Sequence, residues 1–414
     1  MRKAALISAI LLLADAASAD PPGAHWGKVP GLGADMTAAT GTTEGLQVWI
    51  AGFRGRAMQQ GISAVVFDKA MLALNYLPDV VKKDRNQNEF TKTIWDYLDT
   101  AVSDDRLAAG RAALIEHADI LARIEAAYGV DKEVVLAIWG LESAYGAVRG
   151  DTSTLQALAT LAYDGRRAAF FEAELIAALQ ILQSGDVNAA DMTGSWAGAM
   201  GHTQFMPTSY LALAVDFTGD GKRNIWSDDP SDALASTAAY LASFGWQKAN
   251  PWGVEVILPE NFDYALSGER IKKPVADWQA LGIVAAAGTS LPDLGVGSVL
   301  LPGGARGAAF LIFANFQVIE KYNTADAYVI AVGHLADRIK GGPPIAANWP
   351  RALRALSFAE RIELQQRLLA AGFSPGGVDG KIGPLTIAAV KAFQTASGVV
   401  PDGYPSLDVL NRLR

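Results

Sequence analysis

Apolar residues recur every three or four positions through most of the chain between about residues 45 and 246. One such series runs through Leu175, Leu179 and Leu182. This spacing places apolar side chains on one face of a helix. The pattern therefore predicts a helical region over this part of the chain.

The pattern changes between about residues 252 and 314. Val254-Glu255-Val256-Ile257-Leu258 is a β-type run, and glycine and proline residues interrupt the stretch that follows it. We predict a small β-rich subdomain here. A helical pattern returns between Asn315 and Ile339. The predicted fold class is therefore mainly α (α+β), with a helical N-terminal part and a small β subdomain.

A chain of 414 residues is longer than one compact core usually requires. Gly341-Gly342-Pro343-Pro344 cannot continue a helix, so residues 341–349 are predicted to form a linker. Residues 20–340 then form one large region, and residues 350–414 form a separate C-terminal domain, predicted to be a small helical bundle.

The first residues have the pattern of an export signal. Arg2 and Lys3 precede an apolar run from Ala4 to Leu13, and Ala17-Ser18-Ala19 offers small residues for cleavage. The run is too short to span a bilayer. We therefore predict a signal peptide over residues 1–19 and a soluble, exported, periplasmic protein without a membrane span.

Composition and charge narrow the choice of partners. The chain has no cysteine, which excludes disulfides, thiolate metal sites and the lipid anchor of bacterial lipoproteins. The formal net charge of −8 argues against nucleic acid as a partner. The four histidines are too scattered to indicate a metal site, and no organic cofactor is expected.

One carboxylate lies within an apolar helical pattern. The predicted helix runs from Lys132 to about Tyr145, and Glu142 shares a face with Ile138 and Trp139. Burial among such side chains would raise the pKa of Glu142, as a general acid for a glycosidic oxygen requires. From periodicity alone, a solvated or paired carboxylate at the helix edge is an open alternative.

The motifs around Glu142 resemble a known family. They are Trp139-Gly140-Leu141-Glu142-Ser143-Ala144-Tyr145-Gly146, Ala157 to Asp164, Gly194-Ser195-Trp196-Ala197-Gly198-Ala199-Met200-Gly201, Gln204-Phe205-Met206-Pro207 and Tyr322-Asn323. Together they resemble the membrane-bound lytic transglycosylase B family of peptidoglycan-cleaving enzymes. The resemblance covers nearly all of residues 45 to 340 and implies a lysozyme-like helical core.

The resemblance implies that Glu142 is the single catalytic acid and base. It would protonate the leaving oxygen of the MurNAc-GlcNAc β-1,4 bond and then deprotonate the MurNAc C6 hydroxyl, which attacks C1 to give a 1,6-anhydro end. An ordinary glycosidase needs a second carboxylate nearby. No second acid stands in the matched motifs except Asp164 and the acidic cluster described below, which is consistent with a one-acid mechanism.

The resemblance also implies substrate contacts along a groove. Ser195 would lie near the catalytic glutamate, Gln204 and Phe205 would line the sugar groove, and Arg166 and Arg167 would suit the anionic lactyl-peptide portion of MurNAc. The implied aromatic lining comprises Tyr97, Tyr240, Tyr322 and Tyr328. Without the family, each tyrosine is more often a core residue. Gly198, Gly201 and Pro207 are expected to shape a turn, and His202 is interpreted as a groove-edge side chain and not a metal ligand.

An aspartate cluster follows Val215. Asp216-Phe217-Thr218-Gly219-Asp220-Gly221-Lys222 has oxygen side chains at positions 1, 3 and 5 and glycine at position 6, as an EF-hand calcium loop begins. Position 7, Lys222, would offer its backbone carbonyl. Position 12 is Ser227, and the family instead closes the loop with an aspartate that corresponds to Asp232. Asp228 or Asp229 could substitute, and a solvated Asp-Gly turn is the alternative to a structural calcium ion.

The C-terminal segment resembles the type 1 peptidoglycan-binding domain. The matching positions include Leu364 to Leu368, Val378-Asp379-Gly380, Phe393-Gln394 and Asp402-Gly403. Residues 350–414 carry eight basic and five acidic residues, a net charge of +3 that suits an anionic wall. Such a domain would concentrate the enzyme on peptidoglycan glycan strands, the predicted partner.

The predicted activity is therefore that of a lytic murein transglycosylase. Two alternatives remain at this point. A muramidase would use water in place of the C6 hydroxyl, and a non-catalytic scaffold protein would bind the wall without cleaving it.

Overall fold

The computed structural model of the chain describes residues 41–85, 92–288 and 290–414. The predicted signal peptide lies outside the described residues. The chain divides into two compact units, and each consists of two separate stretches of sequence. The first comprises Met1–Gln87 with Trp139–Tyr240, and the second comprises Asn88–Ile138 with Leu241–Arg414.

The first unit is helical, with one two-stranded ladder. The ladder pairs β1 (Thr152–Ser153) with β2 (Thr193–Gly194) in antiparallel fashion. The helices that lie within the unit are α1 (Thr43–Gln59), α2 (Ala64–Met71), α3 (Pro78–Arg85), α8 (Thr154–Asp164), α9 (Ala168–Ser184) and α10 (Pro207–Leu213). The end of α7 (Lys132–Ser143) and most of α11 (Ser231–Ser243) belong to the same unit.

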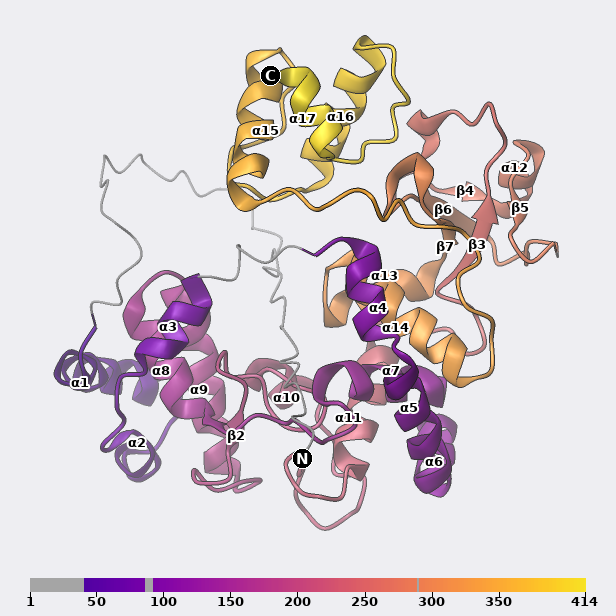
Figure 1. Cartoon of the computed structure of the whole chain (residues 1–414). Coiled ribbons are helices and arrows are strands. Elements are labelled where there is room, and N and C mark those ends of the chain that lie inside the picture. The colour runs from indigo at the N-terminus through magenta and orange to yellow at the C-terminus, as the bar shows by residue number, and fades with distance from the viewer. Residues whose placement is uncertain (1–40, 86–91, 289) are drawn as a thin grey trace, which may run out of the picture. The chain divides into compact units, whose positions relative to one another are not determined.

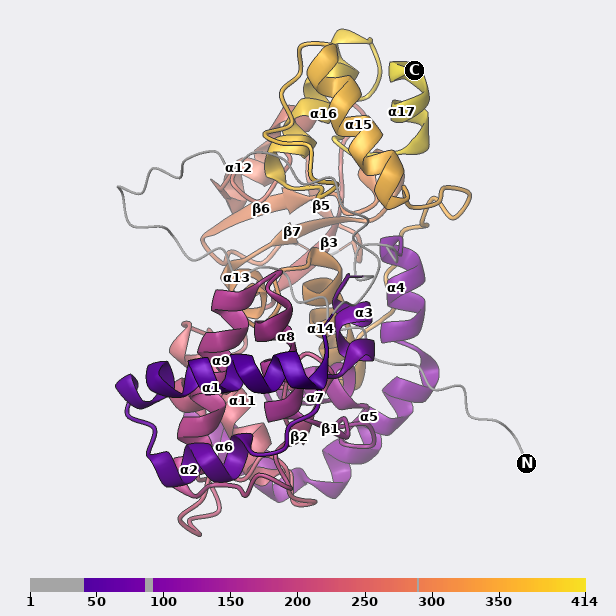
Figure 2. The same cartoon turned by 90° about the vertical axis from the view of Figure 1, so that its left-hand side faces the viewer.

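Helix α8 forms the centre of this unit. Eight of its eleven residues are buried, on every side of the helix, and α1, α3 and α9 all contact it. A helix that is apolar all around is stable only when neighbours cover each face. Figure 2 shows α1 running across α8 and α9. The core of the unit therefore follows α8.

The second unit contains a β subdomain. Strands β3 (Gly253–Ile257), β4 (Lys273–Pro274), β5 (Val284–Ala285), β6 (Val296–Leu300) and β7 (Ala309–Ile312) form an antiparallel sheet in the order β4-β6-β7-β3-β5. The short helix α12 (Val275–Ala280) lies beside this sheet (Figure 1). Its Trp278 is buried in the core of the β subdomain, and the indole N–H of Trp278 donates to the carbonyl of Gly297 at 2.9 Å. Two single turns of 3-10 helix, η2 (Tyr264–Leu266) and η3 (Gly304–Arg306), lie in the connections.

Five helices of the second unit come before or after this sheet in the sequence. They are α4 (Ile94–Ala101), α5 (Asp104–Glu116) and α6 (Ala118–Tyr128) before it, and α13 (Ala314–Tyr322) and α14 (Asp326–Ile339) after it. Helix α14 is buried along most of its length and contacts α4, α5 and α13. The predicted change from helix to strand and back to helix is thus present in the structure.

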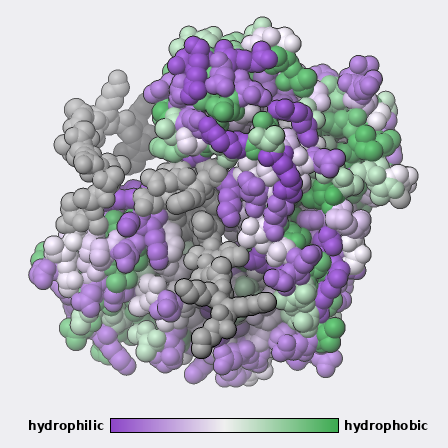
Figure 3. Space-filling model, viewed as in Figure 1, coloured by the Kyte–Doolittle hydropathy of each residue, from purple (hydrophilic) through white to green (hydrophobic). Residues whose placement is uncertain are grey.

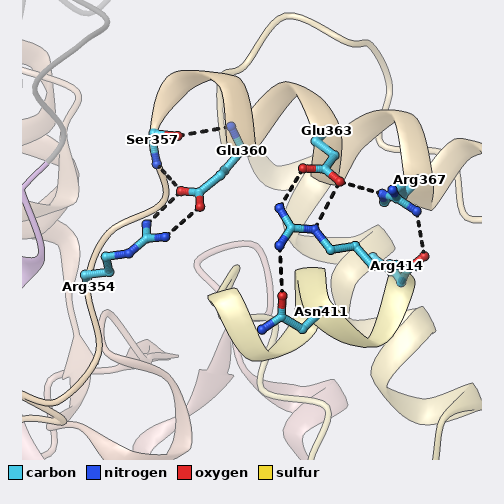
Figure 4. A network of polar contacts seen from close by, with 8 residues as sticks. Arg354, Ser357, Glu360, Glu363, Arg367, Asn411 and Arg414 are labelled. Carbon is cyan, nitrogen blue, oxygen red and sulfur yellow. Dashed lines mark hydrogen bonds and ion pairs between the residues drawn. The ribbon is translucent and has the colours of Figure 1, made fainter.

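The C-terminal segment is a bundle of α15 (Phe358–Ala370), α16 (Pro384–Ala396) and α17 (Leu407–Leu413) (Figures 1 and 2). Its core contains Leu364, Leu368 and Val390. Ser357 and Glu360 form a capping box at the start of α15. Glu363 accepts hydrogen bonds from Arg367 and from Arg414, which links α15 to α17 (Figure 4).

The predicted linker makes specific contacts within the second unit. The backbone N–H groups of Ala346 and Ala347 donate to the carboxylate of Glu255 at 2.8 and 2.7 Å. Further along, Lys391 of α16 donates to the backbone carbonyls of Tyr264 and Ser267 at 3.0 and 2.6 Å. The bundle is therefore attached to the β subdomain through side-chain contacts and not through its chain connection alone.

The predicted fold class, mainly α with a small β subdomain, is confirmed. Within the described residues no helix has the length and apolar character that crossing a bilayer requires. On the face of the molecule drawn in Figure 3, hydrophilic side chains gather over the C-terminal bundle.

Candidate functional site

Glu142 lies in the last turn of α7. The residues before it, from Val134 to Leu141, are all buried, so packing holds this helix along its length. The helix ends at Ser143, two residues earlier than the sequence pattern indicates. Ala144, Tyr145 and Gly146 all adopt left-handed backbone conformations, with φ of 51°, 57° and 85°.

Glu142 itself is 8% exposed. The structure therefore favours the buried carboxylate over the solvated one at the helix edge. The protonation state of Glu142 stays a prediction.

The glycines of the Glu142 motif make room for rings. A Cβ on Gly140 would lie 2.5 Å from the ring of Tyr145, and a Cβ on Gly146 would lie 2.7 Å from the ring of His202. The rings of Tyr145 and His202 each pack edge-on against Trp139, with centroids 5.7 Å apart in both pairs. The spacing of this motif thus has a packing reason in addition to any chemical one.

The sequence interpretation placed His202 at the edge of a groove, but the structure shows that this residue is buried. It is 3% exposed, and both of its ring nitrogens lie within hydrogen-bond distance of protein atoms. Burial lowers the pKa of His202, which favours the neutral imidazole. No sequence signal could have found this position, because its partner Trp139 is 63 residues away.

Ser195, Gln204 and Phe205 lie on the segment that follows β2, which contains two successive turns. Isolated bridges pair Gly194 with Met200 and Met200 with Phe205. The expectation that glycines shape a turn here agrees with the structure. Gly201 has φ of 70°, and a Cβ there would lie 2.4 Å from the carbonyl oxygen of Ile225.

The polar groups of this segment are partly used by the protein. The Ser195 hydroxyl accepts the backbone N–H groups of Ala197 and Ala199 at 3.3 and 3.1 Å. The amide nitrogen of Gln204 donates to the carbonyls of Arg149 and Gly201 at 3.0 and 2.8 Å. Within the part of the chain that the structure describes, the hydroxyl proton of Ser195 and the carbonyl oxygen of Gln204 are the groups that remain for a ligand.

The predicted aromatic lining divides between the two units. Phe205 and Tyr240 are buried in the first unit and pack edge to face, with ring centroids 5.9 Å apart. Burial raises the pKa of Tyr240 to about 12, so its hydroxyl is neutral. Tyr97 of α4, Tyr322 of α13 and Tyr328 of α14 belong to the second unit.

Arg166 and Arg167 bind a carboxylate that the sequence interpretation missed. Arg166 donates two hydrogen bonds of 2.5 Å to Asp84 of α3, and Arg167 donates one of 2.7 Å. Asp84 is 1% exposed. The buried carboxylate of Asp84 therefore orients both guanidinium groups.

The acidic loop folds back toward α11. Carboxylate oxygens of Asp216, Asp220 and Asp232 lie within 4.8 Å of one another. Asp232 accepts the backbone N–H groups of Phe217 and Thr218 through one oxygen and that of Asn224 through the other, at 2.9 to 3.0 Å. Asp232 therefore closes the loop that Asp216 opens.

The other predicted ligands of this cluster take part in different hydrogen bonds. The Thr218 hydroxyl donates to Asp216 at 3.3 Å, and the Lys222 backbone N–H donates to Asp220 at 2.8 Å. Asp228 binds Arg149 instead, and Asp229 accepts from Ser231 at the start of α11. Three converging carboxylates fit a hard cation such as calcium, which takes oxygen ligands.

Comparison with known proteins relates the chain to two families. The family described as "Transglycosylase SLT domain" matches residues 45–337, and that described as "Putative peptidoglycan binding domain" matches residues 359–413. Membrane-bound lytic murein transglycosylase B of Escherichia coli (strain K12) is 34% identical over 250 residues, which are 59% of this chain and 66% of that protein. The chain thus matches just under two thirds of this curated relative.

The chain is also similar to solved structures of lytic transglycosylases. SltB3 from Pseudomonas aeruginosa in complex with NAG-anhNAM-pentapeptide has a TM-score of 0.87 and 50% identity, over 89% of this chain and 99% of that one. The Escherichia coli lytic transglycosylase Slt35 in complex with calcium has a TM-score of 0.60 and 30% identity, over 72% of this chain and 93% of that one.

Proposed function

The chain belongs to the transglycosylase SLT domain family, and from this premise we propose that it is a lytic murein transglycosylase. Its substrate is the peptidoglycan glycan strand, in which it cleaves the MurNAc-GlcNAc β-1,4 bond and leaves a 1,6-anhydro-MurNAc end. The observation that carries the proposal is the position of Glu142, a buried carboxylate at the end of a packed helix, inside the motif on which the resemblance rests.

The reaction uses Glu142 twice. As an acid, it gives its proton to the glycosidic oxygen while the bond from that oxygen to C1 of MurNAc breaks. As a base, it then takes the proton of the MurNAc C6 hydroxyl while this oxygen bonds to C1. The carboxyl group returns to its starting form, and no water is consumed. A nucleophile held within the substrate needs no second carboxylate to activate water.

The segment after β2 orients the sugars. The Ser195 hydroxyl, which already accepts two backbone N–H groups, donates its proton toward the site of Glu142. The Gln204 carbonyl accepts from a sugar hydroxyl, because both hydrogen bonds of its amide nitrogen go to the backbone. Arg166 and Arg167, oriented by Asp84, bind the anionic lactyl-peptide portion. Among the expected aromatic residues, Tyr97 and Tyr322 of the second unit are partly exposed and can offer ring surface to a pyranose, whereas Phe205, Tyr240 and Tyr328 are buried.

A structural calcium ion belongs to the same proposal. Asp216, Asp220 and Asp232 would hold it, with Thr218 and the Lys222 carbonyl as further oxygen ligands. The ion would offset the repulsion among three carboxylates and stabilise the loop that leads into α11. A chelator should therefore lower the melting temperature, and the Asp220→Ala variant should show no such response.

The C-terminal bundle binds the wall polymer and raises the local concentration of substrate. Lys391 of the bundle binds the β subdomain, so the bundle adds a second binding surface to the second unit. We further propose that the protein is exported to the periplasm, where its substrate lies.

Mass spectrometry of digested sacculi tests the activity. The expected products carry 1,6-anhydro-MurNAc ends, and Glu142→Gln should abolish their release while sacculus binding is unchanged. Reducing ends without anhydro products would instead identify a muramidase. Binding without any cleavage by the wild-type protein would identify a scaffold protein.

A further inference from the structure

His202 occupies a buried position between the end of α7 and the segment from Ile225 to Asp228. The indole N–H of Trp139 points at Nδ1 of His202, with 3.1 Å between the nitrogens. On the other side of the ring, Nε2 of His202 lies 2.7 Å from the carbonyl oxygen of Ser227. The ring thus bridges two segments that are far apart in sequence.

These partners fix the tautomer. An indole nitrogen can only donate, so Nδ1 of His202 must be the acceptor. A carbonyl oxygen can only accept, so Nε2 must carry the proton and donate to Ser227. The arrangement is satisfied by one species alone, the neutral imidazole with its proton on Nε2.

The backbone of His202 holds the same helix end. The Ser143 hydroxyl donates to the carbonyl of His202, and the N–H of Gly146 donates to the Ser143 hydroxyl at 3.0 Å. The N–H of His202 donates to the carbonyl of Ile225 at 3.1 Å. Ser143 directly follows Glu142, and Trp139 lies three residues before it. Trp139 and Ser143, which lie before and after Glu142 in the last turn of α7, therefore both bind His202.

Arg149 holds the far side of this bridge in place. Its guanidinium donates to the carbonyls of Trp226 and Ser227 at 2.9 and 2.7 Å, and to the carboxylate of Asp228 at 2.8 Å. One guanidinium nitrogen also lies 3.2 Å from Nε2 of His202, and its positive charge further disfavours a charged imidazole. Ser227 cannot easily move away from His202, because its carbonyl is shared with Arg149. The bridge is consequently a fixed point against which the end of α7 can be oriented.

We propose that His202 is a positioning residue, which through Trp139 and Ser143 sets the direction in which the last turn of α7 presents Glu142. This rests on the proposed function, because it concerns the orientation of the acid and base of that reaction. A proton donor must lie within about 3 Å of its acceptor in the right direction, so a small rotation of this turn slows the chemical step. It leaves the groove that binds the sugar in place.

His202 has no other role that the structure supports as well. Within the described residues it belongs to none of the groups that could hold a metal ion. With 3% of its surface exposed, it offers little area to a sugar.

The test separates the two ring nitrogens. In the full-length protein, His202→Asn places an amide oxygen near Nδ1 and keeps an acceptor for Trp139. His202→Gln places its amide nitrogen near Nε2 and loses that acceptor. Trp139→Phe removes the donor and keeps an aromatic ring. His117→Gln, at the junction of α5 and α6, serves as the control variant.

Release of anhydro products from a soluble glycan strand gives kcat and KM for each variant. We expect His202→Gln and Trp139→Phe each to lower kcat about tenfold or more with KM unchanged. His202→Asn should recover most of that loss. The double variant His202→Gln/Trp139→Phe should be no slower than either single variant, because the two substitutions break the same hydrogen bond.

Three results would overturn the proposal: equal loss in the Asn and Gln variants, multiplied losses in the double variant, or loss confined to KM. Circular dichroism and thermal melting show whether each variant is folded. If His202→Gln does not fold, Trp139→Phe and His202→Asn still decide the outcome. Failure of the proposed function is distinguishable, since the wild-type protein would then give no anhydro product.

Discussion

The buried carboxylate of Asp84 offers a quantitative test of how the first unit is held together. Asp84 lies on α3, and it binds Arg166 and Arg167, which occupy the connection from α8 to α9. Arg85 of the same helix binds Asp164 at the end of α8 at 2.7 Å. Replacing Asp84 by Asn keeps the size of the side chain and removes its charge.

The expected cost follows from the exposure of the partners. Removing one member of a buried ion pair typically costs about 3–5 kcal/mol, because the remaining charge is buried without compensation. The Asp84 side chain is 1% exposed, but those of Arg166 and Arg167 are 34% and 16% exposed. Water can partly solvate the two guanidinium groups, so we expect the low end, about 3 kcal/mol.

Asp68 supplies a matched control in the same unit. It also accepts two hydrogen bonds from one arginine, Arg54, at 2.8 and 2.9 Å. Its side chain is 57% exposed and that of Arg54 is 41% exposed. Exposed pairs of this kind contribute little to stability. Asp68→Asn should therefore leave the melting temperature unchanged within error.

Thermal and urea denaturation measure both variants. For a domain of 150–250 residues, each kcal/mol lowers the melting temperature by about 2–4 °C, so Asp84→Asn should lower it by roughly 6–12 °C. Equal melting temperatures for the two variants would contradict this prediction, because burial would then not determine how much an ion pair contributes to stability. Larger KM with unchanged stability would instead assign Asp84 to substrate binding alone.

Two further predictions concern the other acidic clusters. Asp232→Asn should remove the effect of a chelator on the melting temperature, whereas Asp228→Asn should retain it, since Asp228 binds Arg149; the opposite pattern would show that Asp228 closes the loop. In the second unit, burial and the nearby Glu269 raise the pKa of Glu320 to about 8 and that of Asp326 to about 7, against a smaller opposing effect of Lys321 on Glu320. The folded state then keeps protons that the unfolded chain releases above about pH 4.5, so this cluster should reduce stability as the pH rises from about 4.5 to 8. Glu320→Gln should make the melting temperature less dependent on pH over that range, and an unchanged dependence would contradict the assignment.

Much of the fold could be predicted because its signals are local. The spacing of apolar residues distinguishes the helices from the strands, which begin after residue 252 in the β subdomain. Each such spacing pattern lies within one element. The sequence pattern puts the end of α7 two residues too late, because Ala144 and Tyr145 adopt left-handed conformations that these residue types rarely take. Packing of Tyr145 against Gly140 and Trp139 accompanies that conformation.

Local sequence patterns are sufficient to predict the fold class, the family resemblance, the candidate acid Glu142 and the opening of the acidic loop. Each of these depends on residues close together in the chain. The folded chain, by contrast, pairs Asp84 with Arg166 across 82 positions and Trp139 with His202 across 63. Likewise, it brings Asp232 and not Asp228 to Asp216. The physical reason is that such partners are chosen by the packing of whole helices, and a local pattern contains no information about which distant residue will lie opposite.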